Sequence, residues 1–506
     1  MEENPSYYLL LLASLSMFLL IVLKKYSSRQ KPNSPPTPPS LPIIGHLHLI
    51  KQSLHLSLSS LSSRYGPIFS LQLGSKSFVV VSSPSAVEEC FTKNDVVLAD
   101  RPKTMAGDRL TYSYAAIAWS PYGHLWRSLR RLSVVELFSP HSLQKSAGLR
   151  EEEMRRVLRA LRGGGNRRVV DLNYLASVYS FNHMMRCVAG KSCVGEEEIG
   201  GEAGKEYLKR IRGLFSASLS QGMCDFFPVL RWIGYQGMEK KLISLHEKRD
   251  EFLQNLVDEV KMKKDINGEG ERNLIETLLS LQLSEPEFYT DDVLKSIILV
   301  MFIAGTETTA VTIEWAMSLL LTHPDQLHKL RQEIDDNIGH GHLLNDSDLS
   351  KLPYLRCVIN ETLRLHPPVP LLLPHYSSEN CTVGGYDVPK GTILLVNAWA
   401  MHRDPNVWDE PSKFNPGRFS DVETGREGYK LVPFGMGRRA CPGVGMGLRM
   451  VSLVLGALIQ CFDWEKVLGH DKEMESMYKA IMLQKAKPLE AVCIARSEAA
   501  HLLSQL

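Results

Sequence analysis

The sequence predicts a mainly helical protein with small β-sheets, preceded by an N-terminal transmembrane helix. An unbroken run of apolar or small residues spans Tyr7–Leu23. Amphipathic helical patterns fill most of residues 150–290, and a long, almost wholly apolar helical pattern follows them. Short runs of β-forming residues around glycine turns predict the small sheets.

Composition sets broad limits on the protein. The 506-residue chain is 44% hydrophobic and 23% charged, which is ordinary for a globular protein and enough for a large core or two domains. A net charge of +2 gives no sign of nucleic-acid binding. The nine cysteines form no CxxC pair and no zinc-ligand spacing. Their odd number and irregular spacing indicate reduced thiols in a reducing compartment.

The N-terminal apolar run indicates an uncleaved signal anchor, with a cleaved signal peptide as the alternative. Its 17 residues would reach roughly 25 Å as a helix, near the lower limit for crossing a bilayer. Acidic residues precede the run and basic residues follow it, which places the bulk of the chain in the cytosol. We therefore expect a lumenal N-terminus at residues 1–6, the anchor at 7–23, a basic and proline-rich hinge at 24–45, and a cytosolic domain at 46–506. The prolines favour a stiff spacer, with a disordered linker as the alternative.

The first elements after the hinge are a hairpin and a basic helix. Ile68–Leu73 and Ser77–Val81 flank a Gly-Ser turn and predict two paired strands. Trp126 and Arg130 stand four residues apart on one face of a predicted helix. An indole N–H and a guanidinium that project together can bind a carboxylate. An exposed basic helix would give the same pattern.

Thr290 and the two acids after it predict the start of a long helix that ends before Pro324. This helix is apolar nearly all round, so it is either buried or crosses a membrane, and Glu307 argues against the membrane. Gly305 weakens the helix at mid-length, and Glu307 and Thr308 follow. The combination suits a ligand cavity with proton delivery, although threonine hydroxyls often bond back to their own helix.

Three features follow the long helix. Glu361 and Arg364 can pair on one helix face, which is common and usually of little consequence on a surface. A strand pair is expected around Gly384-Gly385. The last long helix is expected from about Gly445 to Ile459.

A glycine- and proline-rich loop near the C-terminus carries Cys441. The loop runs Phe434-Gly-Met-Gly-Arg-Arg-Ala-Cys-Pro-Gly443. Glycine lets the backbone approach a flat ligand closely, and nearby arginines favour the thiolate, which is the form that ligates metals. The loop suggests an axial thiolate on a haem iron. A buried structural cysteine is the alternative for a lone cysteine, so the other motifs must decide.

Four of these motifs, in this order and at these separations, resemble those of the haem-thiolate monooxygenases of the cytochrome P450 family. The matching stretches are Trp126-x-x-x-Arg130, Ala304-Gly305-x-Glu307-Thr308-Thr309, Glu361-x-x-Arg364 and Phe434-x-x-Gly437-x-Arg439-x-Cys441-x-Gly443. The resemblance covers the chain from the anchor onward. Residues 456–465 and 485–493 are further similar to plant microsomal members that hydroxylate phenolic metabolites such as isoflavonoids and lignans.

The resemblance implies a role for each matching residue. Cys441 would ligate the iron of haem b in the way for which this family is known, and Phe434 would shield the sulfur. Glu307 and Thr308 would deliver protons during oxygen activation. Haem-binding residues beside these would be Gly443 and, at the propionates, Trp126, Arg130, His375 and Arg439. A buried structural triad behind the haem would consist of Glu361, Arg364 and Arg418, although Gly417 replaces the acid usual before that last arginine.

The resemblance also implies an activity and its partners. The protein would be a monooxygenase anchored in the endoplasmic reticulum membrane, hydroxylating a lipophilic aromatic plant metabolite with O2 and electrons from NADPH. The electrons would come through cytochrome P450 reductase, docked on the haem's proximal face near Arg127, Arg131 and Arg438, with cytochrome b5 as a further candidate. Alternatives are methylenedioxy-bridge formation, a rearrangement without O2, and a haem-binding sensor or carrier without catalysis.

The same resemblance places several apolar regions around the substrate. The regions expected to surround it are Met105–Trp119, Phe215, Phe227, Met301–Ala304, Val369–Leu373 and Ile481–Leu483. For any one of these residues, a place in the ordinary core is an equally good expectation. Residues 473–484 fit the family's usual C-terminal substrate loop poorly, so this loop gives little guide to the substrate.

Overall fold

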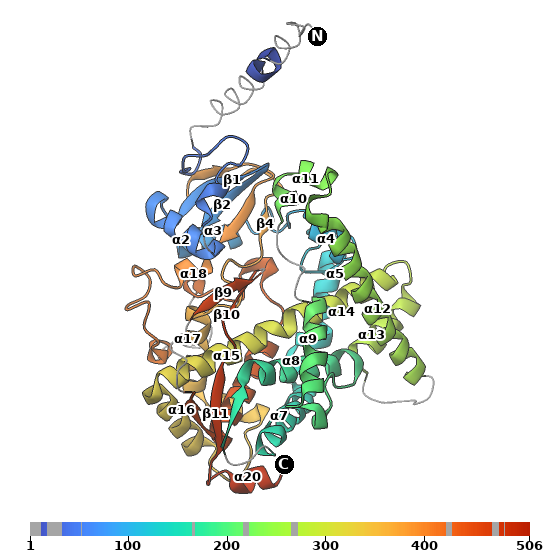
Figure 1. Cartoon of the computed structure of the whole chain (residues 1–506), viewed down its shortest axis with the longest axis vertical. Coiled ribbons are helices and arrows are strands. Elements are labelled where there is room, and N and C mark those ends of the chain that lie inside the picture. The colour runs from blue at the N-terminus through green and yellow to red at the C-terminus, as the bar shows by residue number, and fades with distance from the viewer. Residues whose placement is uncertain are drawn as a thin grey trace, which may run out of the picture.

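The computed structural model describes residues 12–17, 33–51, 53–163, 167–215, 222–264, 272–420, 428–467, 475–479 and 481–506. Figure 1 shows a largely helical body, with the four-stranded sheet at one end and the smaller sheets elsewhere along the molecule. The predicted fold class, mainly helical with small β-sheets, is confirmed for these residues. Residues 12–17 of the expected anchor are helical and exposed, and the rest of Tyr7–Leu23 lies outside the described residues.

The strands form one four-stranded sheet and three smaller groups. The large sheet has the order β1-β2-β7-β4, in which β1 and β2 are the predicted hairpin, β7 runs parallel to β2, and β4 is antiparallel to β7. The predicted hairpin around Gly384-Gly385 is also present, as β5 and β6. The bounds are β1 Ile68–Leu73, β2 Lys76–Val81, β3 Arg167–Asp171, β4 His375–Tyr376, β5 Cys381–Val383, β6 Tyr386–Val388, β7 Ile393–Val396, β8 Phe462–Lys466, β9 Ser476–Lys479, β10 Met482–Lys485 and β11 Glu490–Ala495.

Helices make up most of the described chain. Their bounds are α2 Leu54–Tyr65, α3 Pro84–Phe91, α4 Met105–Leu110, α5 His124–Ser133, α6 Pro140–Lys145, α7 Ala147–Arg162, α8 Leu172–Ala189, α9 Glu202–Phe215, α10 Met223–Phe226, α11 Val229–Trp232, α12 Met238–Lys264, α13 Leu274–Ser284, α14 Asp291–Gly305, α15 Glu307–Thr322, α16 Pro324–Asn337, α17 Pro353–Leu365, α18 Ala398–Met401, α19 Val444–Cys461 and α20 Ala500–Ser504. The core lies where α15 packs against α8, α17 and α19. The expected last helix corresponds to α19.

The long apolar helix is buried but is not continuous. Thr290 caps its start by accepting a hydrogen bond from the N–H of Val293, as predicted. The helix then breaks at Thr306, where φ is −103° and ψ is −71°. The hydroxyl of Thr306 donates to the carbonyl of Phe302 at 2.6 Å, and that of Thr308 donates to Ala304 at 2.6 Å. Hydroxyls that bond back to carbonyls of the preceding turn bend helices, so the expected single helix becomes α14 and α15.

Two stretches of the described chain are long and apolar enough to cross a membrane. They are Asp291–Thr322 and Val444–Cys461, and 78% and 67% of their most apolar windows are buried inside the protein. Both belong to the core of the helical body. The preference for a buried helix over a second membrane span therefore agrees with the packing.

Candidate functional site

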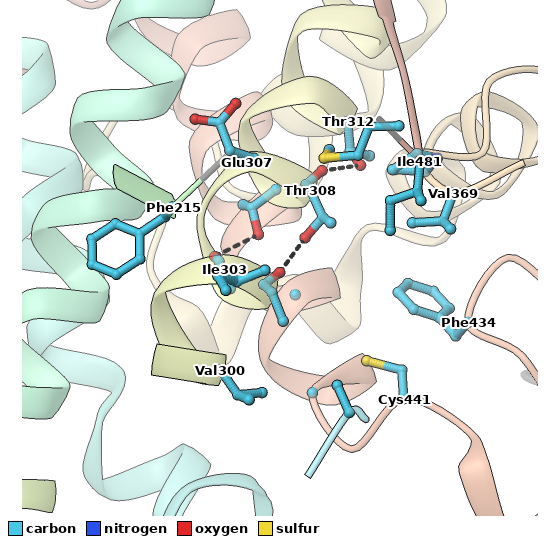
Figure 2. Close-up of a pocket in the computed structure, with 18 of the residues that line it drawn as sticks. Phe215, Val300, Ile303, Glu307, Thr308, Thr312, Val369, Phe434, Cys441 and Ile481 are labelled. Carbon is cyan, nitrogen blue, oxygen red and sulfur yellow. Dashed lines mark hydrogen bonds between the residues drawn. The ribbon is translucent and has the colours of Figure 1, made fainter. Parts of the chain in front are cut away.

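A cavity of about 960 Å³ lies between the α14–α15 break and the Cys441 loop. Figure 2 shows Val300, Ile303 and Thr308 on one side of it and Phe434 and Cys441 on the other. Its wall also includes residues of α5, α9 and α19 and of the β9–β10 hairpin. The lining near Cys441 is largely apolar, which suits a hydrophobic ligand.

The loop that carries Cys441 is held in one shape by its backbone. The N–H of Cys441 donates to the carbonyl of Phe434 at 2.8 Å, which closes the loop and brings the aromatic ring near the sulfur (Figure 2). Gly437 has φ +66°, and a Cβ there would collide with the carboxylate of Asp95. Only glycine fits this position, because the backbone is left-handed and Asp95 occupies the space a side chain needs.

The two arginines before Cys441 bind other groups and not its sulfur. Arg438 pairs with Asp95 at 3.1 Å, and Arg439 donates to the carbonyls of Ala99 and Ser120, both at 2.6 Å. Burial raises the pKa of the Cys441 thiol, against smaller lowering effects from the Gly443 N–H and Arg130. Arg130, and not the two arginines next to Cys441, is the cation that acts to lower the pKa of this thiol. A metal ion bound to the sulfur would deprotonate it directly.

The side chains expected at the haem propionates gather on one flank of the cavity. Trp126, Arg130, His375 and Arg439 all line it. The Arg439 guanidinium lies 4.6 Å from the centre of the Trp126 ring, and Nδ1 of His375 bonds to the Leu98 carbonyl at 2.8 Å. Burial lowers the pKa of Arg439 to about 10 and holds that of His375 well below its usual value.

Arg101 joins this flank and was not predicted. It lines the cavity and donates to the carbonyls of Leu373 and Pro374, at 3.1 and 2.7 Å. None of Arg101, Arg130 and Arg439 forms an ion pair with a carboxylate among the described residues. Half-buried guanidiniums that face a cavity favour an anionic ligand, so this flank fits a ligand with carboxylates such as the haem propionates. No local motif marks Arg101, because its partners are backbone carbonyls, of Ala118 and of residues more than 250 positions later.

Glu361, Arg364 and Arg418 lie together, as the resemblance implied. Glu361 accepts two hydrogen bonds from Arg364, at 2.6 and 2.8 Å, and one from Nε of Arg418 at 3.0 Å. None of the three lines the cavity. Their contacts are structural, and the glycine at 417 does not prevent Arg418 from reaching Glu361.

At the helix break, Glu307 has a partner that the sequence did not reveal. Arg212 of α9 donates to both carboxylate oxygens of Glu307, at 2.5 and 2.8 Å. Figure 2 shows the Glu307 carboxylate directed away from Cys441, while Thr308 projects into the space between them. No sequence pattern marks Arg212, because it lies 95 residues before its partner.

The expected substrate regions are partly correct. The cavity is lined by Ile117–Trp119, Phe215, Met301, Ile303, Ala304, Val369, Leu372, Leu373, Ile481 and Met482. Phe227 and residues 105–116 do not line it. The chain before Phe227 is tied elsewhere, because the Phe226 carbonyl accepts from Ser75 at the β1–β2 turn. Residues 105–116 instead pack under α12, where Tyr112 donates to Asp250 at 2.9 Å.

This fold, with a cysteine facing a largely apolar cavity and three guanidiniums beside it, fits the class of monooxygenases that the sequence motifs resemble. The family model for cytochrome P450 matches residues 35–492. The chain belongs to the cytochrome P450 family.

Curated relatives resemble the chain along nearly its whole length. Cytochrome P450 81Q32 of Catharanthus roseus is 48% identical, covering 95% of this chain and 96% of its own. A (+)-piperitol/(+)-sesamin synthase of Sesamum radiatum is 44% identical, with 97% of each chain covered. An isoflavone 2'-hydroxylase of Glycyrrhiza echinata is 42% identical, again with 97% of each covered. Among solved structures, a zebra fish cytochrome P450 with progesterone aligns with a TM-score of 0.74 at 28% identity, covering 87% of this chain and 99% of its own.

Proposed function

We propose that this protein is a membrane-anchored monooxygenase that hydroxylates a lipophilic aromatic plant metabolite of the phenylpropanoid, isoflavonoid or lignan type. The observation that carries the proposal is the single cavity that joins Cys441 to Thr308 along a largely apolar wall. A flat, lipophilic substrate suits such a wall better than a charged one. The likeness to an isoflavone 2'-hydroxylase supports the aromatic class.

Haem b is the proposed cofactor, with Cys441 as its iron ligand. Phe434 would cover the sulfur. Gly443 would leave room for the ring, since the atoms nearest to where its Cβ would be, from Phe138 and the Cys441 sulfur, are 3.5 to 3.9 Å away. Trp126, Arg130, His375 and Arg439 would hold the propionates by charge-assisted or neutral hydrogen bonds. The bound haem would supply oxygen activation and transfer of one oxygen atom to the substrate.

The helix break would supply the protons that oxygen activation consumes. Thr308 would present its hydroxyl to the cavity, and Glu307 would donate protons from behind it. In the described structure the Thr308 hydroxyl is engaged with the Ala304 carbonyl and Glu307 with Arg212. Each must therefore exchange a partner before it can pass a proton.

A membrane location is supported by apolar side chains around the β1–β2 turn. Trp232 and Ile233 are 87% and 71% exposed, and Ile43 is 66% exposed. The chain next to Ile43 bonds to the turn through the Ile44 carbonyl, and the chain before α11 does so through the Phe226 carbonyl. Figure 1 shows α10 and α11 at the same end of the molecule as β1 and β2. We propose that this end faces the endoplasmic reticulum membrane, with the anchor at residues 7–23, the hinge at 24–45 and the catalytic domain from residue 46 in the cytosol.

Electrons would come from NADPH through cytochrome P450 reductase, with cytochrome b5 as a further donor. Arg127 and Arg131 are exposed on α5, whose Trp126 and Arg130 line the cavity, so they offer positive charge close to the site. Arg438 is also exposed, but its pair with Asp95 neutralises part of its charge.

Two measurements test the proposal. Reduction of the purified full-length protein under carbon monoxide should give the red-shifted Soret band of thiolate ligation, and Cys441→Ala should abolish it. A folded preparation without that band would exclude haem-thiolate ligation. A panel of phenolic plant metabolites should then be screened by substrate-induced spectral shift, with product analysis in the presence of reductase, NADPH and O2.

Methylenedioxy-bridge formation is the second candidate, favoured by the likeness to a (+)-piperitol/(+)-sesamin synthase. The two reactions give different products from an ortho-methoxyphenol. Hydroxylation adds one oxygen atom, whereas ring closure removes two hydrogen atoms from the methoxyphenol. Mass analysis of the product therefore separates the two candidates.

A further inference from the structure

A second carboxylate on α15 lies in the same cavity as Glu307. Glu314 follows it by seven residues, which is two helical turns, and both acids line the cavity. Glu314 is 1% exposed and belongs to none of the motifs that define the site. An acid buried this deeply is costly unless it is paired or protonated, so its place in the cavity wall requires an explanation.

A continuous set of hydrogen bonds joins the two acids. Glu314 accepts from the side-chain amide of Asn173 at 2.7 Å. The side-chain carbonyl oxygen of Asn173 accepts from one nitrogen of Arg212 at 3.0 Å. The other two side-chain nitrogens of Arg212 donate to the Glu307 carboxylate. We call Glu314, Asn173, Arg212 and Glu307 the acid chain. It holds two carboxylates but a single cation, and of the two carboxylates that cation contacts only Glu307.

The charge balance around Glu314 favours proton uptake there. Its other oxygen accepts from the N–H of Leu489 at 2.9 Å, and no ion pair of Glu314 occurs within the described residues. Lys485 of β10 lies near enough to act on it, but donates to the Ser318 hydroxyl at 2.9 Å. Burial is the main cause that raises the pKa of Glu314 to about 7; Asp171 raises it further, while Leu489, Asn173 and Lys485 lower it.

The acid chain also has access to solvent. The part of the cavity wall that holds Asn173 and Arg212 includes Lys205 and Lys209 of α9, and both lysines are exposed. The cavity therefore reaches the surface between α9 and the start of α8, on the side away from the Cys441 loop. Both acids line this cavity, and its volume of about 960 Å³ is large enough to hold water molecules.

We propose that the acid chain positions a proton-loading path, in which Glu314 takes a proton from solvent and passes it through water in the shared cavity to Glu307, for delivery beside Thr308. One proton enters at Glu314 and one leaves at Glu307, so both carboxylates return to their starting charge. Arg212 and Asn173 keep their own protons and hold the two acids in place. The inference rests on the proposed function, since the path is useful only where oxygen is reduced. Glu314 is thus a positioning and supply residue that acts through Glu307.

Glu314→Gln tests this path in the full-length holoprotein. Glutamine keeps the shape and an acceptor but cannot be loaded with a proton. We expect the product formed per NADPH, which we call the coupling, to fall about tenfold, the range seen when residues behind a metal site are changed. In wild type the coupling should change with pH near pH 7, and in the variant this change should be absent. Glu333→Gln is the matched control, because Glu333 likewise accepts two N–H groups, both of them from the backbone, and has a raised pKa, but lies outside the cavity wall.

Infrared spectroscopy gives a readout that does not depend on turnover. Wild-type holoprotein titrated across neutral pH should lose a protonated-carboxyl band near pH 7 that Glu314→Gln lacks and Glu333→Gln retains. Asn173→Leu keeps both acids but breaks the acid chain. Because the Asn173 hydrogen bond lowers the pKa of Glu314, the band of this variant should titrate at higher pH. Its coupling should fall as in Glu314→Gln. If Glu314→Gln loses the band while coupling and its pH profile stay unchanged, the path is overturned. If wild type forms no product from any metabolite, the proposed function fails instead, and the infrared titration is unaffected.

Discussion

Arg364 donates two hydrogen bonds to Glu361, at 2.6 and 2.8 Å, and both side chains are fully buried. Arg364 also donates to the carbonyls of His402 and Pro411, each at 2.7 Å. The imidazole of His402 in turn accepts from the N–H of Val432, two residues before Phe434. The pair therefore ties α17 to the chain that leads into the Cys441 loop.

Loss of the acid in this pair should destabilise the protein strongly. Glu361→Gln leaves Arg364 buried without its counter-charge, which should cost about 3–5 kcal/mol of unfolding free energy and reduce haem incorporation. Glu202→Gln is the control, because Glu202 and Lys205 form a pair at 2.8 Å with the same helical spacing but on the surface. Denaturant unfolding should show a change of less than about 1 kcal/mol for the control. Equal losses of unfolding free energy in the two variants would mean that the buried pair stabilises the protein no more than the surface pair.

A second prediction concerns the hydroxyl at the helix break. Thr308→Ala removes the only proton-bearing group of that side chain, so reductase-driven NADPH oxidation should continue while product falls by about tenfold or more and hydrogen peroxide accumulates. Thr308→Ser should restore coupling. Thr322→Ala serves as control, because Thr322 makes the same kind of bond, to the Ser318 carbonyl at 3.0 Å, at the far end of α15. Unchanged coupling in Thr308→Ala would reject its proposed role.

Local sequence patterns predicted those parts of the site that depend on neighbours along the chain. The hairpin at the Gly-Ser turn, the Thr290 cap and the pair of Glu361 with Arg364 each involve residues within a few positions. The carbonyl-capping hydroxyls at Thr306 and Thr308 are local as well. Even so, whether such bonds break a helix depends on packing, and so the break itself was not predicted.

Local sequence patterns could not predict partners that are distant in the sequence. No motif includes Arg101, Arg212 or Asn173. Arg212 and Asn173 reach the site only because α9 and the start of α8 pack beside α15. Arg101 reaches it only because the chain near residue 101 contacts the residues before His375. The substrate region was over-extended for the same reason. Phe227 belongs to a segment whose tertiary contacts hold it at the β1–β2 turn instead of over the cavity.

The apolar end of the molecule gives a third prediction. Trp232 is 87% exposed, whereas Trp119, Trp126, Trp315, Trp408 and Trp464 are buried. Full-length protein in vesicles that contain brominated lipids should therefore show tryptophan quenching dominated by Trp232, and Trp232→Phe should remove most of it. Met262→Ser, at an exposed position on α12, should leave the quenching unchanged. Quenching that persists in Trp232→Phe would place this end away from the bilayer.

The raised pKa of Glu314 gives a fourth prediction, on stability. Folding shifts this pKa from an ordinary value near 4.5 to about 7, so between these values the folded state binds a proton that the unfolded state has released. The free energy of unfolding from this group is therefore highest below about pH 4.5 and falls as the pH rises through 7. Glutamine cannot ionise and should remove this fall, which is on the order of 3 kcal/mol.

The measurement is the difference in unfolding free energy between Glu314→Gln and wild type, taken at pH values on either side of this window. The difference should move in favour of the variant as pH rises, whatever constant offset the amide introduces at its contacts with Asn173 and Leu489. Other titrating groups contribute equally to both proteins and cancel. A difference that stays constant with pH would mean that the carboxyl is ionised in the folded protein throughout, held by Asn173, Leu489 and Lys485 against the cost of burial.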